Sequence, residues 1–206
     1  MRVKICGVRT AEALEAAAGA DWVGFVFFAR SPRCVTGEEA AALLEGRPAP
    51  RRVGLFVEPG DEEVRAVLAG VRLDVLQVYA SEARVAALRA LSGLEVWRAV
   101  GVAGVGDLPA ESGADGLVVE SRAPAGAGRP GGNGVAVDWG LLRGWAAPVP
   151  WMLAGGLDAG NVAEAVAQSG AVAVDVSSGV ERAPGVKDAG MIRAFIEAAR
   201  GAEAGR

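Results

Sequence analysis

Short runs of apolar and β-branched residues recur along the whole chain, separated by more polar segments. Within each run the apolar residues are nearly continuous rather than alternating with polar ones. Such runs are typical of parallel strands that are covered on both faces. The pattern predicts eight strands, at residues 3–6, 22–28, 52–57, 73–79, 95–100, 116–119, 150–154 and 172–176.

Between these strands the apolar positions fall on helical faces. Three sets show the spacing most clearly: Val64, Val67, Leu68 and Val71; Val85, Leu88 and Leu91; and Met191, Ile192, Phe195 and Ile196. The segment after Val100 fits a helix least well, because three glycines and a proline interrupt it. Eight strands, each followed by a helix, favour a (β/α)8 barrel (TIM barrel) that forms a single domain over residues 1–206. A doubly wound open sheet uses the same alternation, but more often has about five to seven strands.

Composition and the first residues of the chain predict a cytoplasmic location and argue against membrane and nucleic-acid partners. No run approaches the roughly 18 apolar residues of a membrane helix, so no membrane partner is expected. The first residues also lack the layout of a signal peptide, which makes a cytoplasmic location the expectation. The net charge is -4 without a basic cluster, and this argues against nucleic-acid binding.

The chain contains no histidine and only two cysteines, Cys6 and Cys34. Two cysteines are too few for a disulfide framework, and without histidine the usual zinc ligand sets cannot form. Proton chemistry in this chain must therefore use Cys, Asp, Glu, Lys or Tyr.

Cys6 ends the first predicted strand, at the edge where barrel enzymes place their active sites. Lys4 lies two residues earlier and therefore shares a strand face with Cys6. A nearby ammonium group lowers the pKa of a thiol, which predicts a reactive Cys6. The alternative is that Cys6 is a small buried apolar residue, as many unpaired cysteines are.

Two further residues at strand ends could act on a substrate. Glu120 ends the sixth strand and could face Cys6 across the barrel mouth, so that the two form an acid–base pair. A lone glutamate at such a position is otherwise a solvated surface group. Arg33 follows the second strand and could bind a substrate carboxylate with two hydrogen bonds.

The loops after the seventh and eighth strands carry small residues that suit an anion. In this fold these two loops commonly bind phosphate. Gly155 and Gly156 let backbone N–H groups approach an anion, and Ser178 and Gly179 add a hydroxyl group and another amide. Ordinary strand-to-helix turns would explain the same glycines.

Residues 121–134 interrupt the alternation with the sequence SRAPAGAGRPGGNG. This composition predicts a flexible loop at the mouth of the barrel, which is either a lid over the site or an insertion without a role. Its G-x-G-x-x-G match at 126–131 is not a dinucleotide site, because no helix opens at the last glycine.

Five motifs together resemble the phosphoribosylanthranilate isomerase family. They are KICG at 4–7, SPR at 31–33, GGNG at 131–134, LAGGL at 153–157 and VDVSSGVERAPGVKD at 174–188. They occur in the family's order and span nearly the whole chain, and the last is the most specific.

The resemblance implies a (β/α)8 barrel that catalyses an Amadori rearrangement of N-(5′-phosphoribosyl)anthranilate in tryptophan biosynthesis, without cofactor or metal. By this resemblance Cys6 is the general base, and Glu120 occupies the position of the general acid. Arg33 and Asp175 match residues on the anthranilate side of the pocket. The phosphate-binding residues it implies are Gly155, Gly156, Ser178 and Gly179. The expected partner is a small phosphosugar, and the expected assembly is a monomer or homodimer.

The chain departs from the family's pattern in four places. Glu120 stands where an aspartate is usual, Tyr79 with Ala80 replaces a His-Gly pair, Val135 replaces a lysine, and Cys34 replaces an aromatic residue. These changes leave two alternatives open. One is a barrel isomerase for a related aminoribosyl phosphate, and the other is a non-catalytic barrel that binds a phosphosugar.

Overall fold

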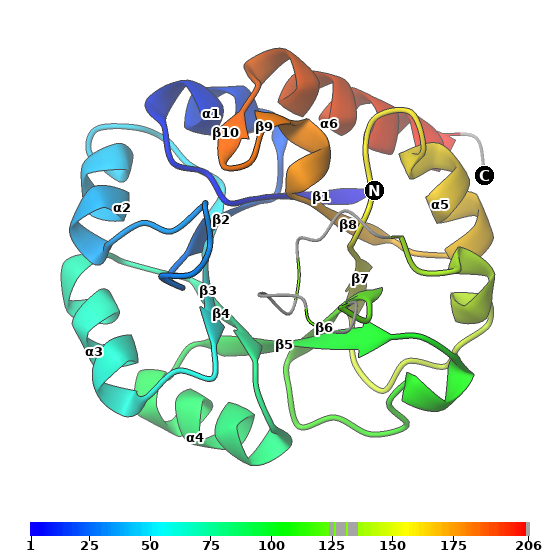
Figure 1. Ribbon diagram of the computed structural model, residues 1–206, viewed down its shortest axis with the longest axis horizontal. Coiled ribbons are helices and arrows are strands. Elements are labelled where there is room, and N and C mark those ends of the chain that lie inside the picture. The colour runs from blue at the N-terminus through cyan, green and yellow to red at the C-terminus, as the bar shows by residue number, and fades with distance from the viewer. Residues whose placement is uncertain (124–125, 127–130, 132–135, 205–206) are drawn as a thin grey trace.

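A closed barrel of eight parallel strands forms the centre of the molecule (Figure 1). The computed structural model describes residues 1–123, 126, 131 and 136–204. Each strand pairs with the next along the chain, and β8 pairs with β1, so the predicted barrel is confirmed and the open sheet is wrong. The strands are β1 (Arg2–Cys6), β2 (Trp22–Val26), β3 (Arg51–Val57), β4 (Val75–Tyr79), β5 (Glu95–Val102), β6 (Gly116–Ser121), β7 (Trp151–Leu153) and β8 (Ala173–Val176).

Helices surround the barrel in Figure 1. The α-helices are α1 (Ala11–Ala16), α2 (Gly37–Leu44), α3 (Asp61–Gly70), α4 (Glu82–Ser92), α5 (Val162–Ser169) and α6 (Ala189–Ala204). Local sequence sets several of their ends. Thr36 and Glu39 form a capping box at the start of α2, and α4 begins at the cap Ser81 and ends at the left-handed Gly93.

The expectation of a helix after every strand is wrong at two places in the described chain. After β5 and β6 the structure has only single 3-10 turns, η2 (Val105–Asp107) and η3 (Trp139–Leu142). Glycine and proline explain the first of these, since Gly101, Gly104, Gly106 and Pro109 all disfavour a continuous helix.

Among the described residues, no helix has both the length and the apolar character needed to span a bilayer.

Side chains along each strand point alternately outward and into the barrel, and this divides the core into two parts. Outward residues such as Val3 and Ile5 pack with the helices in the larger cluster. Inward residues fill the barrel, where Trp22 and Trp97 meet edge to face with ring centroids 5.3 Å apart. The residues nearer the carboxyl ends of the strands are left to line a cavity at the mouth.

A short antiparallel hairpin follows β8 and precedes α6. After the turn η4 (Ser178–Val180), it consists of β9 (Glu181–Ala183) and β10 (Val186–Lys187). Its turn residue Gly185 lies against the loop after β2, where an added Cβ atom would come within 2.3 Å of the Pro32 carbonyl oxygen. The hairpin therefore joins the last strand to the loop that carries Arg33.

Candidate active site

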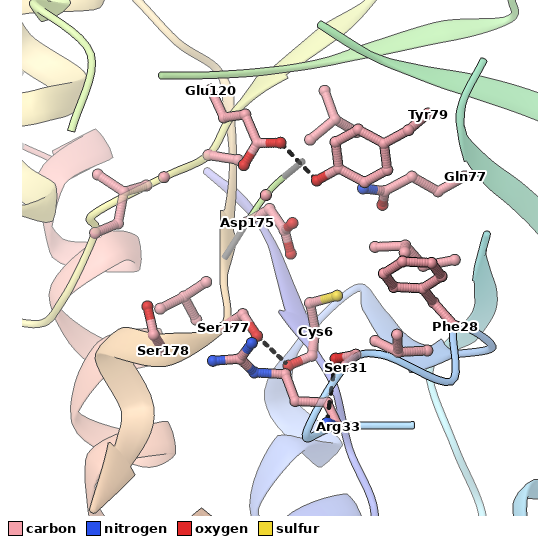
Figure 2. A pocket seen from close by; sticks show the side chains of 18 of the residues that line it. Cys6, Phe28, Ser31, Arg33, Gln77, Tyr79, Glu120, Asp175, Ser177 and Ser178 are labelled. Carbon is pink, nitrogen blue, oxygen red and sulfur yellow. Dashed lines mark hydrogen bonds between the residues drawn. The ribbon is translucent and has the colours of Figure 1, made fainter. Parts of the chain in front are cut away.

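A cavity opens at the carboxyl ends of the strands, where the sequence placed the candidate residues. Its volume is about 700 Å³, including the part open to solvent. Figure 2 shows Glu120 and Tyr79 on one side and Cys6 on the other. The cavity is lined by Cys6, Val26, Phe28, Ser31, Arg33, Leu55, Val57, Gln77, Tyr79, Val118, Glu120, Gly131, Ala154, Gly155, Gly156, Leu157, Asp175, Val176, Ser177 and Ser178.

Cys6 lies inside the barrel, on the same face of β1 as Lys4, as its position in the strand predicted. Gly24 of β2 leaves room for both groups, because a Cβ atom there would lie 3.0 Å from the Cys6 sulfur and 3.3 Å from Lys4 Nζ. The expected lowering of the thiol pKa is wrong for the site as a whole. Burial raises the pKa of Cys6, and the charges of Lys4 and Lys187 offset this only in part.

Lys4 is fully buried and forms an ion pair with Asp175 across the seam between β1 and β8. Lys4 Nζ donates to Asp175 Oδ1 at 2.9 Å. Burial disfavours the ammonium group, but Asp175 and Cys6 outweigh it and hold the pKa of Lys4 above its usual value. Lys4 therefore places a positive charge next to the thiol.

Glu120 points into the barrel and is only 5% exposed, so it is not a solvated surface group. The Tyr79 hydroxyl group of β4 donates to Glu120 Oε1 at 2.5 Å. Burial, and then the negative charge of Glu120 in its ionised form, raise the pKa of Tyr79 well above its usual value, so that Tyr79 stays a donor. Gly131 lies directly over this pair, since an added Cβ atom would be 2.0 Å from the Tyr79 oxygen and 2.5 Å from Glu120 Oε1.

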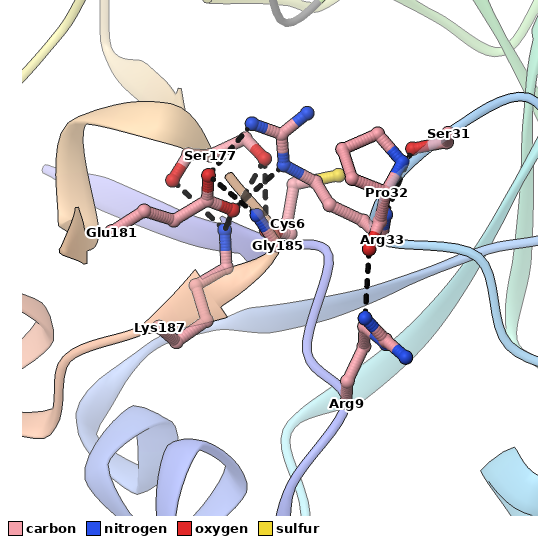
Figure 3. Close-up of polar contacts among 9 residues, drawn as sticks. All are labelled: Cys6, Arg9, Ser31, Pro32, Arg33, Ser177, Glu181, Gly185 and Lys187. Atoms are coloured by element: carbon pink, nitrogen blue, oxygen red, sulfur yellow. Dashed lines mark hydrogen bonds and ion pairs between the residues drawn. The ribbon is translucent and has the colours of Figure 1, made fainter. Parts of the chain in front are cut away.

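Arg33 also lines the cavity, but it is already held by a carboxylate of the protein. Its Nε and Nη2 atoms donate to Glu181 Oε1 and Oε2 at 2.7 and 2.8 Å (Figure 3). Lys187 Nζ donates to the same Glu181 Oε1 at 2.8 Å and to the Ser177 carbonyl oxygen at 2.8 Å. The Ser177 hydroxyl group in turn donates to the Cys6 carbonyl oxygen at 3.1 Å.

The glycine and serine residues after β7 and β8 form one wall of the cavity. Gly155 and Gly156 have φ values of +83° and +66°, a left-handed backbone that other residues rarely adopt. Both line the cavity together with Ser178. Gly179 has a different contact, because an added Cβ atom would lie 1.8 Å from the Leu157 carbonyl oxygen. Gly179 thus lets the two loops approach each other.

Sequence reasoning missed the residues behind this wall. Glu181 and Lys187 lie in the specific motif at 174–188, but nothing in the sequence shows that they reach Arg33, which is 148 residues from Glu181. Gln77 was also missed, and its buried Oε1 atom has no hydrogen-bond partner among the described residues. Most of the loop at 121–134 lies outside the described residues, although Gly131 lines the cavity. Among all the residues that the structure describes, no three His, Cys, Asp or Glu side chains are grouped to hold a metal ion.

The fold and the site define the class of the protein: it is a (β/α)8-barrel enzyme with ionisable side chains at the carboxyl ends of its strands. A family model described as N-(5′-phosphoribosyl)anthranilate (PRA) isomerase matches residues 3–198. The chain belongs to the phosphoribosylanthranilate isomerase family, as its motifs predicted.

Individual relatives agree with this assignment over their whole length. N-(5′-phosphoribosyl)anthranilate isomerase from Acidiphilium cryptum is 56% identical over 98% of this chain and 99% of its own. The enzyme from Paramagnetospirillum magneticum is 51% identical over 98% of both chains. The crystal structure of the Thermus thermophilus enzyme superposes with a TM-score of 0.83 at 32% identity, covering 98% of this chain and 99% of that one.

Proposed function

We propose that the chain converts N-(5′-phosphoribosyl)anthranilate into 1-(2-carboxyphenylamino)-1-deoxyribulose 5-phosphate, an Amadori rearrangement in tryptophan biosynthesis. The observation that carries this proposal is that Cys6 and Glu120, from β1 and β6, line one buried cavity. The wall of Gly155, Gly156 and Ser178 borders the same cavity. A solved relative is in complex with reduced 1-(o-carboxyphenylamino)-1-deoxyribulose 5-phosphate, 31% identical with a TM-score of 0.79.

In the proposed reaction Glu120 acts first, as the general acid. It gives a proton to the ring oxygen of the ribose, and the bond from that oxygen to C1′ breaks. The electron pair on the anthranilate nitrogen forms a C1′=N double bond, which leaves the nitrogen positively charged. Tyr79 holds one carboxyl oxygen of Glu120 by its hydrogen bond, so that the acid has a fixed direction.

Cys6 acts second, as the general base. Its thiolate removes the proton from C2′, and the released electron pair forms a C1′=C2′ double bond that neutralises the nitrogen. The C2′ hydroxyl group then loses its proton while C1′ gains one, which gives the aminoketone. Lys4 supports the thiolate that this step requires, because its ammonium group lies beside Cys6 and is fixed by Asp175.

The two ends of the substrate have separate walls in this proposal. The backbone amides of Gly155, Gly156 and Gly179 and the hydroxyl group of Ser178 bind the phosphate group. Arg33 and Asp175 lie on the anthranilate side, with Arg33 directed at the ring carboxylate. The substrate thus spans the cavity with C1′ and C2′ between the acid and the base.

The test is a fluorescence assay of phosphoribosylanthranilate consumption by the purified protein. We expect turnover by the wild type, and we expect Cys6→Ser and Glu120→Gln each to lower kcat by about 10²–10⁴-fold. Cys34→Ser is the matched control for loss of a thiol and should keep wild-type activity. Absence of turnover by the wild type, or full activity of either variant, would contradict the proposal. Turnover of another aminoribosyl phosphate alone would favour the related isomerase.

A further inference from the structure

The hairpin after β8 carries two buried charged side chains, Glu181 and Lys187, that the proposed chemistry does not use. Their side chains are 4% and 2% exposed, so both charges are almost completely removed from water. A buried charge is costly unless it is paired and hydrogen-bonded. Two buried charges beside the cavity, within the most specific motif of the chain, therefore point to a role in the site.

The carboxylate of Glu181 is saturated with donors. Its Oε1 atom accepts from Arg33 Nε and Lys187 Nζ, and its Oε2 atom accepts from Arg33 Nη2 and from the backbone N–H of Gly185 at 3.2 Å. Burial alone would raise the pKa of Glu181, but Arg33 and Lys187 outweigh it and hold that pKa below its usual value. Glu181 is therefore a fixed anion behind Arg33.

This contact uses only one edge of the Arg33 guanidinium group. A guanidinium group has five N–H donors, and Glu181 takes one from Nε and one from Nη2. Of the remaining three, one from Nη1 and one from Nη2 lie along the Nη1–Nη2 edge, and Figure 3 shows one guanidinium nitrogen turned away from Glu181. Because Arg33 lines the cavity while Glu181 lies behind it, this second edge can meet a ligand carboxylate with two hydrogen bonds.

Close packing keeps Arg33 in this orientation. Gly7 after β1 has a φ of +77°, and an added Cβ atom there would lie 2.6 Å from Arg33 Cδ. On the other side Gly185 approaches the Pro32 carbonyl oxygen, which also accepts from Arg9 Nη1 at 2.7 Å. The stem of Arg33 is therefore enclosed, and Glu181 sets the direction of its head.

We propose that Glu181 is a positioning residue for substrate specificity: it fixes Arg33 so that the second guanidinium edge selects a ligand whose aromatic ring carries a carboxylate. This inference rests on the proposed function and names a residue that determines which substrate the enzyme accepts. It concerns recognition of the ring carboxylate, whereas the loops after β7 and β8 bind the phosphate group.

The test measures binding of two probes by isothermal titration calorimetry. They are reduced 1-(o-carboxyphenylamino)-1-deoxyribulose 5-phosphate and the same compound without the ring carboxylate. We expect the wild type to prefer the carboxylated probe, and Glu181→Gln to lower that preference by about tenfold while binding of the other probe changes little. The ratio of the two dissociation constants in one protein cancels any loss of folded material.

Two comparisons distinguish positioning from a general structural role. If Glu181 acts through Arg33, Arg33→Met with Glu181→Gln should show the same preference as Arg33→Met alone. Glu95→Gln is the matched control, because Glu95 pairs with Arg51 at 2.9 Å on the exposed surface. An equal loss for both probes, or additive losses in the double variant, overturns the inference. So does a wild type without preference for the carboxylated probe, even where the turnover assay succeeds.

Discussion

At the scale of single residues, the protonation state of Cys6 depends on two opposing effects. Burial favours the neutral thiol, whereas the ammonium groups of Lys4 and Lys187 favour the thiolate. Burial is the larger effect, so the thiol is protonated in the resting enzyme at neutral pH. As the proposed general base, Cys6 is active only in the small fraction of molecules in which it has lost this proton.

This balance predicts an alkaline pH dependence. Because the pKa of Cys6 lies above that of an ordinary thiol, its thiolate fraction should rise by about tenfold per pH unit from neutral pH until that pKa is reached. The rate of iodoacetamide labelling of Cys6 in the Cys34→Ser protein should rise over the same range. A labelling rate that stays constant from about pH 7 to pH 9 would contradict the raised pKa of this thiol.

At the scale of elements, the two loops of the glycine and serine wall depend on each other. Gly179 after β8 and Leu157 after β7 are in such close contact that no side chain fits between them. Neither loop can keep its backbone direction if the other moves. We therefore regard the wall as one unit built by two adjacent strands.

Gly179→Ala should separate the two loops, because the added methyl group would lie 1.8 Å from the Leu157 carbonyl oxygen. We expect a loss of about 1–3 kcal/mol in the free energy of unfolding, measured with urea, and weaker competitive inhibition by inorganic phosphate. Gly201→Ala in α6 is the control, since that position has open space and a helix favours alanine. Equal stability of the two variants would rule out this role for Gly179.

The sequence predicted the strands well because burial on both faces leaves a continuous apolar signal. It also predicted that Glu120 could face Cys6 across the barrel mouth, and both residues line the cavity. The helices after β5 and β6 were predicted wrongly because alternation of strands and helices outweighed local glycine content. The alternating pattern predicted a helix after each strand, but it did not predict that these two connections would contain only a short 3-10 turn among the described residues.

The contacts of the site were less predictable, since they join residues that are far apart in the chain. The hydrogen bond from Tyr79 to Glu120 crosses the barrel from β4 to β6, and the pair of Arg33 and Glu181 crosses from the β2 loop to the hairpin. The direction in which the pKa of Cys6 shifts also depends on how deeply this residue is buried. Residue types and strand parity contain none of this information.

At the scale of the whole molecule, the Lys4–Asp175 pair lies at the seam that closes the barrel. The two residues are direct partners in the register of β1 and β8. Asp175→Asn would leave the ammonium group of Lys4 buried without an opposite charge. We expect a loss of about 3–5 kcal/mol in the free energy of unfolding, measured with urea.

A surface pair provides the control for this prediction. Glu95→Gln removes one partner of an ion pair whose side chains are about half exposed, and it should cost no more than about 1 kcal/mol. If Asp175→Asn lowers the free energy of unfolding no more than Glu95→Gln does, the buried pair does not stabilise the contact between β1 and β8. Replacing both partners, as Lys4→Met with Asp175→Leu, should restore part of the lost stability.

The position of this pair also bears on how the enzyme is made. Lys4 leaves the ribosome 171 residues before Asp175, which at about 5–20 residues per second is a delay of roughly 10–30 s. During that interval β1 can pair with β2, but the thiol of Cys6 has not met the strand that completes its surroundings. Catalytic competence should therefore appear only after nearly the whole chain has been translated.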